Sequence, residues 1–172
     1  MAKTTFSGPV YSKNGFINTG PGNTISLTAD TTLTVAAHAG RLLLTNDADG
    51  VFTLPTINVN ANSAVAGDTD YNNLNNIGAT FNFYVETAAT DMDIKTDGTD
   101  KFKGAILSAV DDGAKKAFFP ATNNDVITMN GGTKGGLVGS ILSITAIDDD
   151  AYLVHSSLLK ATATIVTPFA DA

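Results

Sequence analysis

Apolar and polar residues alternate along most of the chain, and this alternation predicts β-strands. In the stretch 24–30, Ile25 and Leu27 fall on one face while threonine and serine fall on the other, and the stretch 31–37 repeats the pattern. A period of two with polar outward positions is typical of strands that are buried on one face. The continuous apolar run at 40–46 instead predicts a strand that is covered on both faces.

Turn sequences separate these runs. The runs at 40–46 and 50–55 flank the sequence NDADG, which predicts a β-hairpin. A second hairpin is predicted around the turn Asp148-Asp149-Asp150. Further strands are predicted at 79–86, 92–96, 102–110, 115–120, 125–130, 139–147, 151–158 and 161–166. About eleven short strands with turn signals roughly every 8–12 residues favour a sandwich or barrel over alternating strands and helices.

The composition supports the same fold class. The chain has sixteen Asp but a single Glu, Glu86, it has no Gln, and it is rich in Thr, Asn and Gly. Good helix formers are therefore scarce, whereas strand and turn formers are abundant. We expect an all-β protein whose residues 23–172 form a β-sandwich or barrel-like (jelly-roll-like) domain of mostly antiparallel strands. A chain of 172 residues is long enough to bury a core of this kind.

Two segments depart from this pattern. Residues 1–22 contain the breaker sequences GP, NG and GPG, which predict an extended arm, and residues 56–79 hold seven Asn without a sustained period, which predicts a long loop. Both carry apolar side chains that need burial, so we expect them to contact neighbouring subunits; the arm could instead fold back on its own domain. The predicted interface residues are Phe6, Val10, Tyr11, Phe16, Ile17, Tyr71, Leu74, Ile77, Phe118 and Phe119.

Charge and composition narrow the classes of partner. The net charge of −7 disfavours binding to nucleic acid. No apolar run approaches the ~18–20 residues of a membrane span, and no apolar segment follows Lys3 as in a signal peptide. The chain has no Cys, so disulfides and thiolate metal sites are not available. We expect no cofactor.

Few residues are candidates for catalysis. His38 and His155 are the two imidazoles, and each is predicted to lie at a turn or near the end of a strand. A nucleophilic triad needs a hydroxyl and a carboxylate beside one of them, and the sequence contains no G-x-S-x-G motif. We therefore expect no catalytic residues and no enzymatic activity.

Acidic turns and a glycine loop were also considered as binding sites. Asp47 and Asp49 begin a calcium-loop pattern without completing it, and Asp148 to Asp150 are three adjacent carboxylates. Asx residues before glycine are also ordinary turn formers, so we expect plain turns and no metal, with a weak structural Ca²⁺ site as the open alternative. The loop GGTKGG lacks the spacing of a phosphate-binding P-loop.

Five segments carry a resemblance to a known family. They are, in order, TTFSGPVYSKNGF, HAGRLLLTNDADGVFTLP, FNFYVETAATDMDIKTDGTDKFKGAILS, DVITMNGGTKGGLVGSILSITAI and ATIVTPFADA. Their order resembles small structural proteins encoded beside the major capsid protein in tailed bacteriophages, especially marine ones, of the head decoration (cement) type. In that family a Trp commonly occupies the position of Tyr152.

The resemblance implies a function. It implies a non-enzymatic virion protein, made in the host cytoplasm, that binds the major capsid protein on the outer surface of the capsid and stabilises it. It also implies a homo-oligomer, with a trimer favoured. The alternative is a fibre or spike component that recognises a host receptor or glycan, for which Phe118-Phe119-Pro120 is the candidate aromatic cluster.

Overall fold

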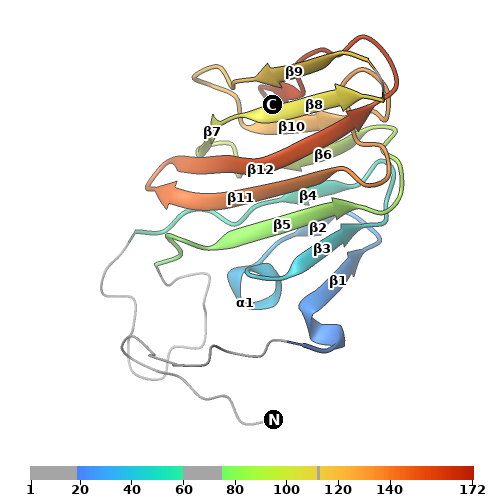
Figure 1. The fold of residues 1–172 in the computed structure, drawn as a ribbon. Coiled ribbons are helices and arrows are strands. Elements are labelled where there is room, and N and C mark those ends of the chain that lie inside the picture. Colours follow the sequence, from blue (N-terminus) through green and yellow to red (C-terminus); the bar gives the residue numbers. More distant parts are fainter. Residues whose placement is uncertain (1–18, 60–74, 112) are drawn as a thin grey trace, which may run out of the picture.

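The structure is a computed structural model that describes residues 19–59, 75–111 and 113–172. These residues form two mixed β-sheets that pack face to face, together with a short helix, α1 (Val35–His38), and one turn of 3-10 helix, η1 (Pro21–Asn23) (Figure 1). The predicted all-β class is therefore confirmed, and the two sheets are consistent with a β-sandwich.

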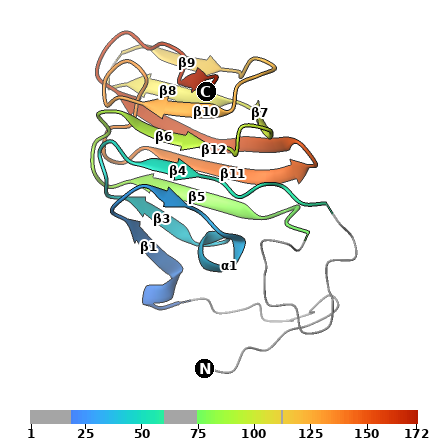
Figure 2. The same cartoon turned by 180° about the vertical axis from the view of Figure 1, so that it is seen from behind.

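We call the larger sheet, which has eight strands, sheet A, and the smaller, which has five, sheet B. From one edge to the other, sheet A consists of β1 (Thr24–Leu27), β3 (Leu42–Thr45), β5 (Thr80–Val85), β11 (Ile141–Asp148), β12 (Ala151–Ala161), β8 (Ile106–Val110) and β9 (Lys115–Phe118), and β7 (Lys101–Gly104) also pairs with β12. Sheet B consists of β2 (Thr31–Thr32), β4 (Val51–Thr53), β6 (Met92–Lys95), β10 (Val126–Met129) and β13 (Phe169–Ala170). Figure 1 looks onto sheet A, and Figure 2 shows sheet B from the opposite side.

The first six strands alternate between the two sheets. β1, β3 and β5 are neighbours in sheet A, β2, β4 and β6 are neighbours in sheet B, and all these pairings are parallel. Each turn of the chain thus stacks on the one before, as in a β-solenoid. The predicted hairpin of 40–46 with 50–55 is wrong, because β3 and β4 lie in different sheets and NDADG carries the chain from one to the other. The sheets are mixed rather than mostly antiparallel, since six of the eleven pairings are parallel.

The later strands include the second predicted hairpin, which is confirmed. β11 and β12 are antiparallel and turn at Asp148–Ala151. The predicted strand 102–110 is divided into β7 and β8 because Gly104 has a φ of 90°, and a Cβ there would lie 2.1 Å from the Val154 carbonyl oxygen. β12 pairs with both pieces, and within it Ser156 has a φ of 47°.

Two further strand predictions are wrong in part. The predicted strand 31–37 is only β2, because Thr34 caps the helix α1 by accepting a hydrogen bond from the Ala37 amide (3.3 Å). The predicted strand 161–166 is not a strand, since β12 continues to Ala161 and the residues that follow it bond elsewhere. Lys116 Nζ donates to the Ile165 carbonyl (3.0 Å), which is a side-chain contact rather than a ladder bond.

The core lies between the sheets. Its largest fully buried side chains are Tyr152, Phe52, Phe81 and Phe102. The Tyr152 hydroxyl donates a hydrogen bond of 2.5 Å to the Pro55 carbonyl, and so joins a strand of sheet A to the segment that leaves sheet B after β4. Burial raises the pKa of Tyr152, and the nearby carboxylates of Asp100 and Asp97 raise it further.

Candidate functional site

A row of apolar side chains crosses the outer face of sheet A. Side chains at registered positions of neighbouring strands stand next to one another on the same face of a sheet. From β3 through β5, β11, β12 and β8 to β9, the directly opposed residues are Leu44, Tyr84, Ile141, Leu158, Leu107 and Ala117. We call this set the apolar row.

The apolar row is accessible because inward positions alternate with it. Ile141 and Leu107 are each 44% exposed and Leu158 is 38% exposed, while their neighbours on each strand point into the core. Leu42, two positions before the row on β3, is 40% exposed, so the prediction that 40–46 is covered on both faces is wrong. Single exposed apolar residues are common on protein surfaces, but a contiguous apolar patch of this extent marks an interaction surface.

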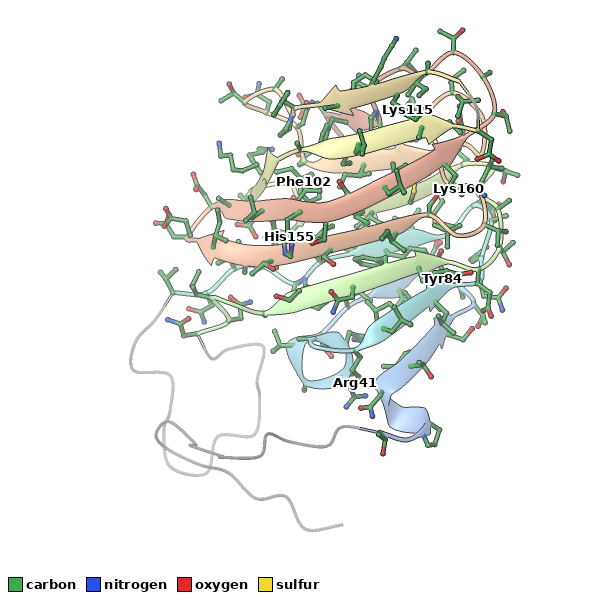
Figure 3. The ribbon with its side chains drawn as sticks, viewed as in Figure 1. Arg41, Tyr84, Phe102, Lys115, His155 and Lys160 are labelled. Atoms are coloured by element: carbon green, nitrogen blue, oxygen red, sulfur yellow. The ribbon has the colours of Figure 1, made fainter. Side chains whose placement is uncertain are left out.

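Hydrogen-bonded polar side chains line one side of the apolar row. The Ser143 hydroxyl donates to Asn82 Oδ1 (2.9 Å), Thr145 Oγ1 lies 2.8 Å from His155 Nε2, and Thr80 Oγ1 lies 2.7 Å from Thr145 Oγ1. These groups are hydrogen-bonded to one another across β5, β11 and β12. Figure 3 shows His155 and Tyr84 on this face, at different positions along it.

Lysines line the other side. Lys160 of β12 and Lys115 of β9 both lie opposite Ala109 of β8. Each of these three residues is two positions from the member of the apolar row on its own strand, and therefore on the same face of the sheet. Lys160 and Lys115 are also labelled in Figure 3. The candidate surface is therefore an apolar row with hydrogen-bonded polar side chains on one side and ammonium groups on the other.

Both histidines contact hydroxyl or backbone groups. His155 bonds Thr145 and lies 3.3 Å from the Ser156 hydroxyl through Nδ1. His38 Nδ1 accepts a hydrogen bond from the amide of Thr34 (2.9 Å), the residue that caps α1. Burial lowers the pKa of His38, and the contact of Nδ1 with the Thr34 carbonyl oxygen (3.2 Å) opposes this shift. Within the described ranges, no carboxylate forms a hydrogen bond with either imidazole.

The acidic turns have structural roles. Asp148 accepts a hydrogen bond from the Asp149 amide (2.9 Å) in the β11–β12 turn, and Asp47 and Asp49 lie in the connection from sheet A to sheet B. Across 19–59, 75–111 and 113–172, no three His, Asp or Glu side chains are arranged to hold a metal ion. Gly131, Gly135 and Gly136 of the GGTKGG loop have positive φ, a conformation that glycine adopts more readily than other residues.

Two buried polar side chains hold the ends of the 56–79 segment. The Asn58 amide donates to Asn76 Oδ1 (2.8 Å), and Asn76 Nδ2 donates to the Thr56 carbonyl (2.8 Å). The Ile57 amide donates to Asp100 Oδ2 (2.9 Å). Burial raises the pKa of the Asp100 carboxyl, the hydrogen bond from Ile57 opposes this shift, and the charge of Asp97 adds to it.

A small hollow lies beside sheet B. Its volume is about 310 Å³, and Thr53, Lys95 and Asp125 contribute to its lining. Asp125 Oδ2 accepts a hydrogen bond from Lys101 Nζ at 2.6 Å. Burial acts to raise the pKa of Asp125, but the hydrogen bonds from Lys101 and from the Ala172 amide outweigh it and hold the pKa below its usual value.

The predicted interface residues have different outcomes. Phe6, Val10, Tyr11, Phe16, Ile17, Tyr71 and Leu74 lie outside the described residues. Ile77 is 40% exposed and Phe119 is 74% exposed, so both are available for contacts, whereas Phe118 is half-buried and packs against the core. The apolar row was not predicted. Its members are visible as outward positions of single strands, but their alignment depends on pairings between distant segments.

Comparison of the chain with protein-family models, with curated proteins and with solved structures finds no match. Among the described residues, no helix has the length and apolar character needed to cross a membrane.

Proposed function

We propose that this protein is a structural virion protein that binds the outside of a tailed-phage capsid and stabilises it, as head decoration proteins do. The sequence resemblance suggests this class, and the feature of the structure that supports it most is the apolar row. A broad, flat face with an apolar row suits contact with another protein surface, whereas small-molecule sites are usually concave.

The proposed mechanism is passive. The two packed sheets provide a rigid body, and one face of that body lies on the capsid. The arm of residues 1–22 and the 56–79 segment add apolar contacts with neighbouring capsid subunits. Several copies in a homo-oligomer, a trimer in this proposal, multiply contacts that are individually weak, because binding of the first copy raises the effective concentration of the others. The net charge of −7 keeps the protein from competing for packaged DNA.

A second candidate function is recognition of a host receptor or glycan by a fibre or spike. Two observations favour it. Phe119 is 74% exposed immediately after β9, where an aromatic ring can stack on a ligand. The parallel coil of β1 to β6 is an architecture that extends by stacking.

Co-sedimentation with purified capsids of the phage that encodes the protein tests the proposal. We expect saturable binding in a fixed stoichiometry to expanded capsids and no binding to immature ones. A form that lacks residues 1–22 should bind more weakly. Absence of binding by the full-length protein to expanded capsids contradicts the proposal, and adhesion to host cells would then support the receptor-binding alternative. Equal binding by both forms would show that the arm is not a capsid contact.

A further inference from the structure

Sheet A differs in charge from the rest of the protein. The whole chain carries 17 acidic and 10 basic residues. The eight strands of sheet A have the opposite balance, since their only carboxylate is Asp148, the last residue of β11. Their basic residues are Lys101, Lys103, Lys115, Lys116 and Lys160.

Three of these lysines belong to the outer face. Lys103 follows the buried Phe102, while Lys115 and Lys160 occupy the register positions beside the apolar row. Lys101 pairs with Asp125, and Lys116 Nζ donates to the Ile165 carbonyl. Lys115 Nζ donates to the Gly113 carbonyl (3.2 Å) at the exposed turn before its strand, which leaves its charge and its other N–H donors for a partner. Glu86 and Asp111 lie just beyond the ends of β5 and β8, so these two carboxylates border the face without entering its strands.

We infer that the outer face of sheet A docks on an acidic patch of the capsid protein that contains an apolar ridge. This inference rests on the proposed function and names the surface and the chemistry of its partner. The apolar row contacts the ridge, Lys160 and Lys115 pair with carboxylates of the partner, and the polar groups around Ser143 and His155 meet uncharged groups. Complementary charge of this kind orients the complex and speeds association.

The outer face of sheet A is large enough to form an interface with another protein. Seven neighbouring strands spaced about 4.8 Å apart span roughly 30 Å, and strands of four to eleven residues at about 3.3 Å per residue span roughly 13–36 Å. The resulting face of several hundred Å² approaches the ~800 Å² per partner that a standard protein interface buries. A second copy of the same face would place lysines against a surface that also lacks carboxylates, which is why a different, acidic surface is the better occupant.

The test compares matched variants of the full chain in binding to expanded capsids. Ile141→Asp changes the apolar row, and Val166→Asp is its control, because Val166 is similarly exposed (43% against 44%) and lies outside the strands of sheet A. Lys115→Glu with Lys160→Glu reverses the charges beside the row. Lys95→Glu with Lys134→Glu makes the same change of net charge outside sheet A. Circular dichroism and thermal unfolding establish that each variant is folded.

We expect Ile141→Asp and the Lys115/Lys160 pair each to weaken binding about tenfold or more, while both controls bind like the wild type. Binding should weaken as salt rises from about 0.05 to 0.5 M, and less so for the Lys115/Lys160 variant. If the wild type binds capsids and Ile141→Asp binds equally well, the inference is wrong while the proposed function stands. If the wild type does not bind, the proposed function itself fails.

Two more outcomes overturn the inference. If the Lys115/Lys160 pair and the Lys95/Lys134 pair have equal effects, the partner is not an acidic patch facing sheet A. Sedimentation velocity of the protein alone tests whether the apolar row is instead an interface between copies of this chain. A concentration-dependent oligomer that Ile141→Asp dissociates and Val166→Asp does not would assign the apolar row to contacts between copies of this chain.

Discussion

Replacement of Tyr152 by Phe tests the principal polar contact of the core. The phenol is fully buried, and its hydroxyl donates to the Pro55 carbonyl at 2.5 Å. Tyr152→Phe keeps the ring but leaves that carbonyl without this donor in the interior. A buried polar group that loses its partner costs about 1–3 kcal/mol, which is larger than the roughly 0.5–1.5 kcal/mol net value of an ordinary hydrogen bond. We therefore expect the free energy of unfolding to fall by about 1–3 kcal/mol.

Urea unfolding followed by circular dichroism measures this change. The midpoint should fall while the m-value stays constant, because the surface exposed on unfolding is unchanged. For a domain of this size each kcal/mol corresponds to about 2–4 °C in Tm. Tyr84→Phe is the control, since Tyr84 is half-buried on the outer face of sheet A, and it should change stability by less than about 0.5 kcal/mol. Equal, small effects of both replacements would refute the reasoning that the hydroxyl of Tyr152 joins the two layers.

Three further replacements test the local structure. Asp100→Asn keeps an acceptor for the Ile57 amide and removes a buried charge. The folded-state pKa of Asp100 is raised, so the wild type loses stability as the pH rises from the unfolded-state pKa of about 3.9 through that raised value. The variant should therefore be more stable than the wild type at pH 7 and not at pH 3. A variant that is less stable than the wild type at pH 7 contradicts this reasoning. Ser156→Val should lower the midpoint of thermal unfolding, by the equivalent of about 1–2 kcal/mol, whereas Ser156→Gly should not, because the φ of 47° is costly for a branched side chain. Gly136→Ala should destabilise more than Gly98→Ala in urea, since both have positive φ but only at Gly136 would a Cβ lie within 2.6 Å of a core side chain; equal losses would show that backbone strain alone matters.

The sequence predicted the class of fold because the signals for it are local. Alternation with period two marks the strands, and an acidic turn between two alternating runs marks the hairpin of β11 and β12. At NDADG the same kind of signal led to the wrong prediction of a hairpin, because a hairpin turn and a connection between two sheets both need residues that end a strand. The difference lies in the partner of the next strand. β4 pairs with β6, about 40 residues further on, and no local pattern contains that information.

The apolar row depends on a similar non-local feature, a shift of register inside β12. Ser143 opposes His155, so regular pairing would place Ser157 opposite Ile141, yet Leu158 is found there. One extra residue in β12, next to Ser156 with its positive φ, produces this shift. A bulge of this kind turns a side chain to the other face, and here it places Leu158 between Ile141 and Leu107. Without the shift the row would be interrupted by a serine at its centre. The strained backbone at Ser156 therefore has a consequence for the surface, because it makes the apolar row continuous from β11 to β8.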